Sequence, residues 1–282
     1  MAGFIRAQRT IALALLACAG AYGQTVRIGV FTLFHPTRFT VRPGSAEAVS
    51  VTGSVTRLLE GRQFATFDGA SWVTISSRSG GAVDLILAIP GKIERRFHGV
   101  VRIRELSAVV ELDREIAVAS VVAAELPANV PMEALKAQAI VARSFLAASR
   151  PRHTGKKNGF DFCDTTHCQF LRAWPDPGNA PRRAAEQTQG FMLSYQGVIF
   201  APLYSAACGG HTLAADEEGY RYQSIPCTYC LRHPNEPVRG HQTGMCQLGA
   251  SAMAAAGASF RQILQHYFPG TAVLRPLEYV LR

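Results

Sequence analysis

The pattern of apolar and polar residues divides the chain into a β-rich half and a half that contains helices. Between residues 25 and 110, short stretches alternate between apolar and polar positions, and β-branched and aromatic residues are frequent in them. A period of two with these residue types indicates strands. We expect strands at 26–31, 64–67, 71–75, 83–87 and 100–103, with turns at Gly61, Gly80-Gly81 and Pro90-Gly91.

Two helices are predicted next, at about 115–126 and 131–149. In the second helix, one apolar stripe is formed by Leu135, Ala139, Ala142 and Leu146, which recur with helical spacing. Pro131 falls in its first turn, where the missing N–H of proline costs nothing. The two helices therefore meet at a proline-rich corner.

The remainder alternates between irregular and regular segments. Residues 151–187 are rich in Gly, Pro, Lys and Arg, which predicts a long irregular segment. A hairpin around Gln196-Gly197 is predicted for 190–195 and 198–204. Ser259 and Gln262 have the spacing of a capping box before a last helix. The predicted fold class is α+β, with a β-rich region at 24–94 and a second domain at 95–282 that contains the helices and the hairpin.

The first 23 residues have the pattern of a secretory signal peptide. Arg6 and Arg9 precede a short apolar run, and small residues follow it. Two kinds of processing are open: cleavage after Gly23, or lipid attachment at Cys18, against which the bulky Leu16 argues. We expect an exported protein of the periplasm or cell envelope, with membrane contact only through a lipid on Cys18.

The chain is basic, since 29 Lys and Arg face 20 Asp and Glu, a formal charge of +9. Basic exported proteins can bind nucleic acid, anionic lipid or an anionic wall polymer. Export argues against nucleic acid, and no run of Lys and Arg interleaved with aromatic residues supports it.

Glu125 is the most conspicuous candidate for chemistry. It ends an apolar stretch of the first predicted helix and stands two residues before Pro127, so it is expected at an exposed corner. An acid with apolar neighbours has a raised pKa and can act as a proton donor. The alternative is an ordinary solvated glutamate at a helix end.

The stretch from Val121 to Phe145 resembles the stage II sporulation protein D family, the SpoIID/LytB-like proteins that cleave peptidoglycan glycan strands or enhance cell-wall amidases. Further blocks agree in the family's order, at 164–169, 204–212, 240–250 and 263–270. The resemblance covers residues 95–271 and implies that 95–282 is a SpoIID-like catalytic domain.

The resemblance implies lytic transglycosylation of glycan strands, in which Glu125 serves as acid and then as base. Ordinary glycosidases need two carboxylates, and no second acid stands out near Glu125, because Glu133 is explained by the dipole of the next helix. No cofactor is required for this reaction. A non-catalytic wall-binding module that stimulates an amidase is the alternative, and a zinc hydrolase is disfavoured by the lack of a His-Glu-x-x-His motif.

Five further residues are candidates for substrate binding. Arg143 matches an arginine of the family's helix, and Gln138 is a lesser candidate on the same helix. His241 and Gln247 lie in a glycine-flanked loop, where this chain departs from the family at Gln242, Thr243 and Cys246. Ser205 has no nucleophile elbow around it and is expected to line the substrate cleft.

The cysteines allow two interpretations. Of seven, Cys18 belongs to the presequence, and an even number left in an exported chain is first explained by disulfides. Zinc is the alternative: Cys227 and Cys230 have knuckle spacing, although one such pair is weak evidence. The resemblance implies a structural zinc on His153, Cys163 and Cys168, with His167 as a competing ligand.

Overall fold

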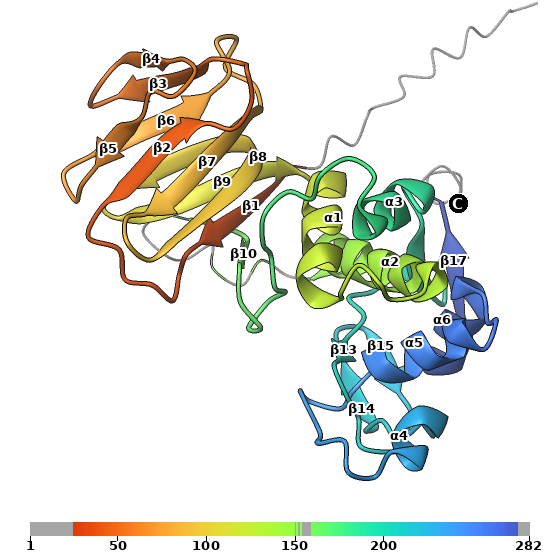
Figure 1. Ribbon diagram of the computed structural model, residues 1–282. Coiled ribbons are helices and arrows are strands. Elements are labelled where there is room, and N and C mark those ends of the chain that lie inside the picture. Colours follow the sequence, from red (N-terminus) through yellow and green to blue (C-terminus); the bar gives the residue numbers. More distant parts are fainter. Residues whose placement is uncertain (1–24, 150, 152, 154–158, 276–282) are drawn as a thin grey trace, which may run out of the picture.

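The computed structural model describes residues 25–149, 151, 153 and 159–275. The expected presequence at residues 1–23, with Cys18, lies outside this range. The predicted α+β class is confirmed. Figure 1 shows strands β1 to β9 gathered on one side of the molecule and the helices on the other.

A ten-stranded sheet forms the β-rich part, with the main strand order β10-β1-β9-β8-β6-β3-β4 and with β2, β5 and β7 joined to it through β8. Its strands are β1 (Thr25–Val30), β2 (Phe39–Pro43), β3 (Val49–Gly53), β4 (Arg57–Leu59), β5 (Ala65–Phe67), β6 (Trp72–Ser76), β7 (Val83–Ile89), β8 (Ile93–Arg104), β9 (Ser107–Asp113) and β10 (Phe162–Cys163).

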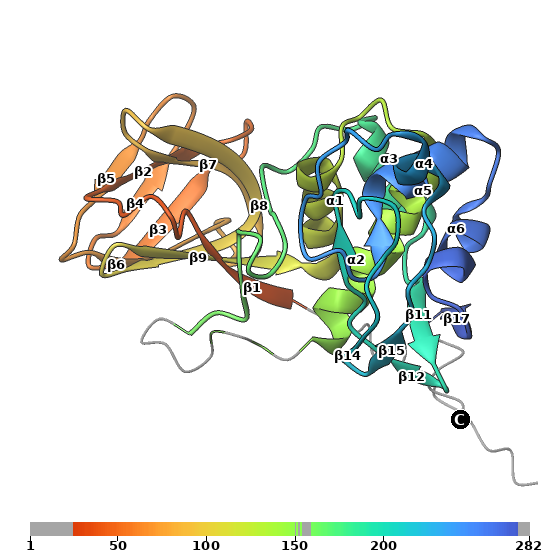
Figure 2. The same ribbon diagram turned by 90° about the horizontal axis from the view of Figure 1, so that it is seen from below.

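The long strand β8 connects two layers. Its first half pairs with β7, and its second half pairs with β6 and β9. Figure 2 shows β8 curving from one layer to the other. Gly99 lies where the partners change, and a Cβ there would stand 2.5 Å from the carbonyl oxygen of Glu111, so glycine is required for this close approach. Alternate side chains of β7 and β8 are buried between the layers.

The helices pack beside the sheet. They are α1 (Arg114–Glu125), α2 (Met132–Ala148), α3 (Ala180–Gln187), α4 (Thr228–Arg232), α5 (Gln247–Ala255) and α6 (Phe260–Tyr267). α1 follows β9 directly, because Asp113 ends the strand and caps the helix by accepting a hydrogen bond from the N–H of Glu115. The predicted stripe of α2 is confirmed, since all four of its residues are buried in the larger core.

The C-terminal part is built from short elements around a second core. The predicted hairpin forms as β11 (Met192–Tyr195) and β12 (Val198–Ile199), and β17 (Thr271–Leu274) pairs with β11. The remaining strands are β13 (Tyr204–Ser205), β14 (Ala215–Glu217), β15 (Tyr220–Tyr222) and β16 (Met245–Cys246). The predicted capping box at Ser259 and Gln262 is present at the start of α6.

Two features differ from the sequence prediction. α3 lies inside the stretch that was predicted to be irregular, and Pro131 is the N-cap of α2 rather than a residue of its first turn. Strand β8 begins at Ile93, beside the boundary predicted at residue 94, and β9 and β10 of the same sheet follow that boundary. Within residues 25–149 and 159–275, no helix combines the length and the apolar character needed to cross a bilayer.

Candidate active site around Glu125

Glu125 is the last residue of α1, one residue before the predicted end of this helix, and its side chain is partly exposed. The helix ends there because Leu126 has extended backbone angles and Pro127 follows. The carboxylate oxygen Oε1 accepts two hydrogen bonds, from the N–H of Phe170 at 3.0 Å and from the hydroxyl of Tyr204 at 2.9 Å. Among the hydrogen bonds of the described residues, the other oxygen, Oε2, has a single long contact of 3.5 Å with the amide Nε2 of Gln247.

Burial raises the pKa of Glu125 above that of an ordinary glutamate, and hydrogen bonds from Tyr204, Phe170 and Gln247 offset this only in part. All three donors are uncharged groups. Burial and the adjacent carboxylate also raise the pKa of Tyr204 well above its usual value, so Tyr204 keeps its proton and remains a donor near neutral pH. The site therefore favours a carboxyl group that can hold a proton.

The groups around Glu125 come from segments that are distant in the sequence. Tyr204 is in β13, which pairs in parallel with β16, and Gln247 follows β16 as the first residue of α5. The pairing of Tyr204 with Met245 and of Ser205 with Cys246 sets the relative positions of Tyr204 and Gln247. Phe170 comes from the irregular segment after Cys168.

Gln138 and Gln247 are both brought to Glu125, but in different ways. The Nε2 of Gln247 lies 3.3 Å from the Oε1 of Gln138, so this amide group contacts the side chains of both Gln138 and Glu125. Gln138 is completely buried on α2. Its side chain orients Gln247 and does not reach solvent.

Ser205 is not directed at the carboxylate. Neighbouring side chains of a strand lie on opposite faces, and Tyr204 occupies the face toward Glu125. Ser205 is buried instead and packs on Gly240, where a Cβ would come within 2.8 Å of the Cβ of Ser205. The sequence interpretation chose Ser205 from this motif and missed Tyr204.

Arg143 lies on α2, and its buried side chain contacts the start of α1, the end of that helix opposite to Glu125. Its guanidinium binds Glu115 with distances of 2.7 Å from Nε and from Nη2, and it also donates to the carbonyls of Phe191 and Ala185. Glu115 and Glu125 are separated by ten residues of helix, about 15 Å along its axis. The structure thus does not bring Arg143 to Glu125, and its buried guanidinium bonds groups of the protein itself.

His241 lies on the surface before β16. Its Nδ1 accepts a hydrogen bond of 3.1 Å from the N–H of Thr243, which holds the ring against its own loop. None of the hydrogen bonds described for Glu125 comes from His241.

Arg172 is a cation that sequence reasoning missed. Its side chain is exposed, its guanidinium lies 4.5 Å from the ring centre of Phe170, and its charge lowers the pKa of Glu125. No sequence pattern marks it, because its position depends on the path of the irregular segment that carries Phe170. An exposed guanidinium beside the carboxyl group can bind an anionic group of a ligand.

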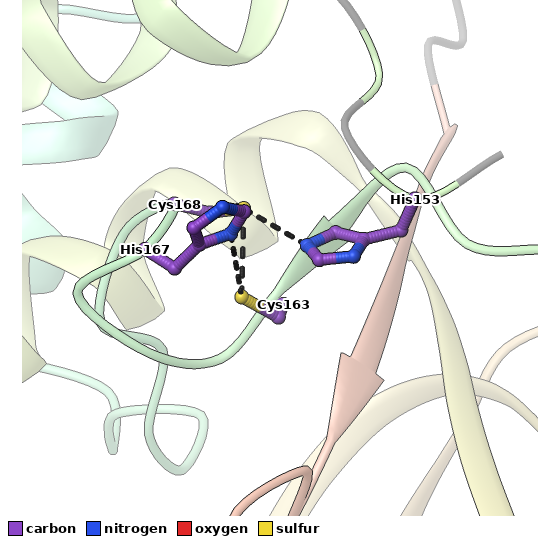
Figure 3. Close-up of side chains that lie close together, drawn as sticks. All are labelled: His153, Cys163, His167 and Cys168. Atoms are coloured by element: carbon purple, nitrogen blue, oxygen red, sulfur yellow. Dashed lines mark hydrogen bonds between the residues drawn. The ribbon is translucent and has the colours of Figure 1, made fainter. Parts of the chain in front are cut away.

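A group of potential metal ligands lies in the same segment: His153, Cys163, His167 and Cys168 (Figure 3). The Sγ atoms of Cys163 and Cys168 are 3.5 Å apart, and the Sγ of Cys168 is 3.5 Å from the Nε2 of His153. The Nδ1 of His167 lies 3.8 Å and 3.6 Å from the two sulfurs. Zinc bonds of about 2.3 Å to sulfur and about 2.0 Å to nitrogen place tetrahedral ligand atoms roughly 3.5 to 3.8 Å apart.

These four residues therefore fit a zinc ion, and the fit includes His167, which the sequence interpretation treated as a competitor of His153. Cys163 belongs to β10, and Cys168 stands two residues before Phe170. A metal here would fix the segment that donates the Phe170 N–H to Glu125.

The β-rich part anchors the same segment through a buried ion pair. The Nη1 of Arg95 on β8 lies 2.7 Å from the Oδ2 of Asp164, and both side chains are buried. Asp164 also accepts hydrogen bonds from the N–H of Phe31 and the hydroxyl of Thr32. The loop beside Glu125 is thereby attached to strand β8 and to the turn that follows β1.

Comparison with known proteins agrees with the resemblance read from the sequence. Residues 103–195 match the model of the family described as stage II sporulation protein (SpoIID). This segment holds α1 with Glu125, α2 and the group of His153, Cys163, His167 and Cys168, and over it the chain is similar to the SpoIID family. Tyr204, His241 and Gln247 lie beyond it.

Two curated relatives are similar over part of the chain. An uncharacterised protein of Brachyspira hyodysenteriae is 35% identical over 108 residues, which cover 38% of this chain and 29% of the relative. The amidase enhancer of Bacillus subtilis is 35% identical over 116 residues, or 41% of this chain and 15% of the relative. The aligned regions thus span less than a third of either relative. The family match supports a cell-wall-related role for this chain.

Proposed function

We propose that the chain is an exported peptidoglycan lytic transglycosylase that cleaves the bond between N-acetylmuramic acid and N-acetylglucosamine, with Glu125 as general acid and then base. The single observation that supports this best is the environment of Glu125: one partly exposed carboxyl group with a raised pKa, held by uncharged donors. Such a group can donate a proton near neutral pH.

The proton is assigned to Oε2. Oε1 already accepts two hydrogen bonds, whereas Oε2 has one long contact, so protonation of Oε2 sacrifices less hydrogen bonding. In the first step Oε2–H protonates the glycosidic oxygen while the bond from the muramic acid anomeric carbon to that oxygen breaks. Tyr204 and Phe170 stabilise the carboxylate that forms.

In the second step the 6-hydroxyl of the same muramic acid attacks the anomeric carbon and gives its proton to the Glu125 carboxylate. The product carries a 1,6-anhydro ring, no water is consumed, and the enzyme regains its proton. One carboxyl group suffices for both steps. Within residues 25–149 and 159–275, no second carboxylate is among the groups bonded to Glu125, which suits this route better than hydrolysis with two acids.

Substrate contacts are proposed for His241 and Gln247, and for Arg172 toward an anionic group such as the lactyl carboxylate of muramic acid. Gln138 is proposed to orient Gln247. We also propose that His153, Cys163, His167 and Cys168 hold a structural zinc. With four protein ligands the ion would have no open position, so it would order the loop and take no part in bond cleavage.

Stimulation of a cell-wall amidase is the second candidate function, and the name of the Bacillus subtilis relative favours it. Digestion of purified glycan strands that carry no peptides separates the two functions, because an amidase has no bond to cut there. We expect the wild-type chain alone to shorten these strands. Glu125→Gln keeps the shape of the side chain but cannot donate a carboxyl proton, so the rate should fall by at least ~100-fold while strand binding persists.

The matched control in this digest is Glu133→Gln, a change of the same kind in the first turn of α2, where Glu133 pairs with Lys136. This variant should cleave at close to the wild-type rate. Intact strands after incubation with folded wild-type protein, together with faster release of peptides when an amidase is added, would contradict the transglycosylase proposal and support the amidase enhancer.

A further inference from the structure

A second group of potential metal ligands lies in the C-terminal part and shares no residue with the group of Figure 3. Cys208, Cys227, Cys230 and Cys246 are all buried, and their four sulfur atoms lie within 4.8 Å of one another. They come from three separate segments: the loop after β13, the start of α4, and the end of β16. The sequence shows the zinc-knuckle spacing of Cys227 and Cys230, and the fold brings Cys208 and Cys246 to them.

The spacing of the sulfurs suits a metal. The Sγ atoms of Cys230 and Cys246 are 3.7 Å apart. Two sulfurs that are each about 2.3 Å from a tetrahedral zinc are roughly 3.8 Å apart, whereas disulfide sulfurs are about 2.05 Å apart. The Sγ atoms of Cys230 and Cys246 thus have the separation expected around one ion, and all four sulfurs lie within 4.8 Å of one another.

Hydrogen-bond donors are directed at the sulfurs. Gly249 donates its N–H to the Sγ of Cys246 at 3.5 Å, and the hydroxyl of Tyr267 donates to the Sγ of Cys227 at 3.7 Å. Backbone N–H groups also bond Cys208 and Cys227, from Gly210 and Cys230 respectively. Such donors stabilise thiolates that carry charge toward a metal, and they gain little from the neutral sulfur of a disulfide.

Glycines make this approach feasible. Gly209 and Gly210 have φ values of +72° and +128°, which lets the chain turn back so that the Gly210 N–H meets the preceding cysteine. A Cβ on Gly249 would lie 2.0 Å from the hydroxyl oxygen of Tyr267 and 2.5 Å from the Sγ of Cys227. The backbone around the group is therefore shaped to bring donors onto sulfur.

We infer that Cys208, Cys227, Cys230 and Cys246 bind one zinc ion as four thiolates in a closed, structural site. The ion would join segments that have little regular structure of their own, since only β14, β15 and α4 lie between β13 and β16. Cys246 directly precedes Gln247 in the sequence, and Cys208 follows four residues after Tyr204. By fixing these two cysteines, the ion would also keep Tyr204 and Gln247 in place beside Glu125. The inference does not depend on the proposed enzyme activity.

The test uses the full chain with Cys163→Ser and Cys168→Ser, which removes two ligands of the other group and leaves these four cysteines unchanged. Elemental analysis after purification without chelator should give one zinc per chain. The protein is then denatured with EDTA and no reductant, alkylated and mapped by mass spectrometry. All four cysteines should carry the alkyl group, because thiolates released from zinc are free thiols.

A matched variant with Cys227→Ser and Cys230→Ser, made in the otherwise wild-type chain, should retain the zinc of the other group and lose one equivalent relative to the wild type. Disulfide-linked peptides among Cys208, Cys227, Cys230 and Cys246 in the wild-type map would overturn the inference. The inference would also be overturned if the variant with Cys163→Ser and Cys168→Ser held less than about 0.2 zinc per chain while its other four cysteines were free thiols. If a variant fails to fold, the zinc content and the map of alkylated cysteines can still be measured on the wild-type chain.

Discussion

At the scale of single residues, the site depends on how the two oxygens of Glu125 differ. Oε1 is held by the N–H of Phe170 and the hydroxyl of Tyr204, whereas Oε2 has one long contact, with Gln247, within the part of the chain that the structure describes. Tyr204 is itself kept in the phenol form by burial and by the carboxylate. These contacts stabilise the ionised acid, yet burial still holds its pKa above the usual value.

The pH dependence of cleavage follows from this balance. Glu125 must be protonated to start the reaction, so the rate should fall as pH rises through its raised pKa. Tyr204→Phe removes a donor that lowers this pKa, so the pKa should rise further and the alkaline limb of kcat should move to higher pH. Loss of the same hydrogen bond from the carboxylate formed in the first step should cost up to ~10-fold in kcat.

Tyr222→Phe is the control for that experiment, because the Tyr222 hydroxyl contacts only the backbone of Leu203 and Ala201 among its described hydrogen bonds. Its alkaline limb should stay at the wild-type pH. The charge of Arg172 also acts on Glu125 and is unchanged in both variants. An alkaline limb in Tyr204→Phe that stays in place, or moves to lower pH, would contradict the assignment of that limb to Glu125.

At the scale of elements, the packing of α1 against α2 is secured by an ion pair between Glu115 on α1 and Arg143 on α2. Arg143 is 1% exposed and joins Glu115 at the start of α1 to the carbonyls of Ala185 in α3 and of Phe191 just before β11. Breaking a buried pair leaves a charge without compensation and is costly. This end of α1 is therefore fixed by Arg143, while its other end presents Glu125.

Arg143→Gln should lower the free energy of unfolding by about 2 to 3 kcal/mol, less than for a fully buried pair because the Glu115 side chain is 28% exposed. Urea unfolding measures this. Arg78→Gln breaks an exposed pair with Glu60 and should cost less than ~1 kcal/mol. If Arg143→Gln keeps wild-type stability but binds glycan strands much more weakly, Arg143 is a substrate ligand after all.

Elements with local sequence signals could be predicted, and contacts between distant segments could not. The stripe of α2, the capping box of α6 and the turn at Gln196-Gly197 are encoded within a few residues, and each is present. α3 was missed although Asn179 and Pro181 mark its start, because the surrounding Gly, Pro and Arg residues indicate a loop. Tyr204 was missed because its contact with Glu125 spans 79 residues and depends on the pairing of β13 with β16.

The cysteines illustrate the same limit. Spacing in the sequence marks Cys163 with Cys168 and Cys227 with Cys230 as local pairs, which fits disulfides and metals equally. The family resemblance, not the spacing, pointed to His153 and His167 beside the first pair, and the fold brings both histidines to it and adds Cys208 and Cys246 to the second pair. Ligand sets assembled from separate segments cannot be read from spacing alone.

At the scale of the whole molecule, three parts meet at Glu125. The sheet anchors the loop of Asp164 and Phe170 through Arg95, the helices α1 and α2 supply Glu125 and Gln138, and the C-terminal part supplies Tyr204 and Gln247. The SpoIID match ends at residue 195, before Tyr204 and Gln247. The complete site thus needs segments on both sides of that limit.

The origin of the new end group tests the central proposal most directly, because intramolecular attack by the 6-hydroxyl consumes no water. Purified glycan strands are cleaved by the wild-type chain in oxygen-18 water, and the fragments are weighed by mass spectrometry, with a muramidase that hydrolyses the same bond as the labelled control. We predict 1,6-anhydro-muramic acid ends without label and with no new reducing ends. Fragments that carry oxygen-18 at the cleaved anomeric carbon would show hydrolysis and would contradict the proposal.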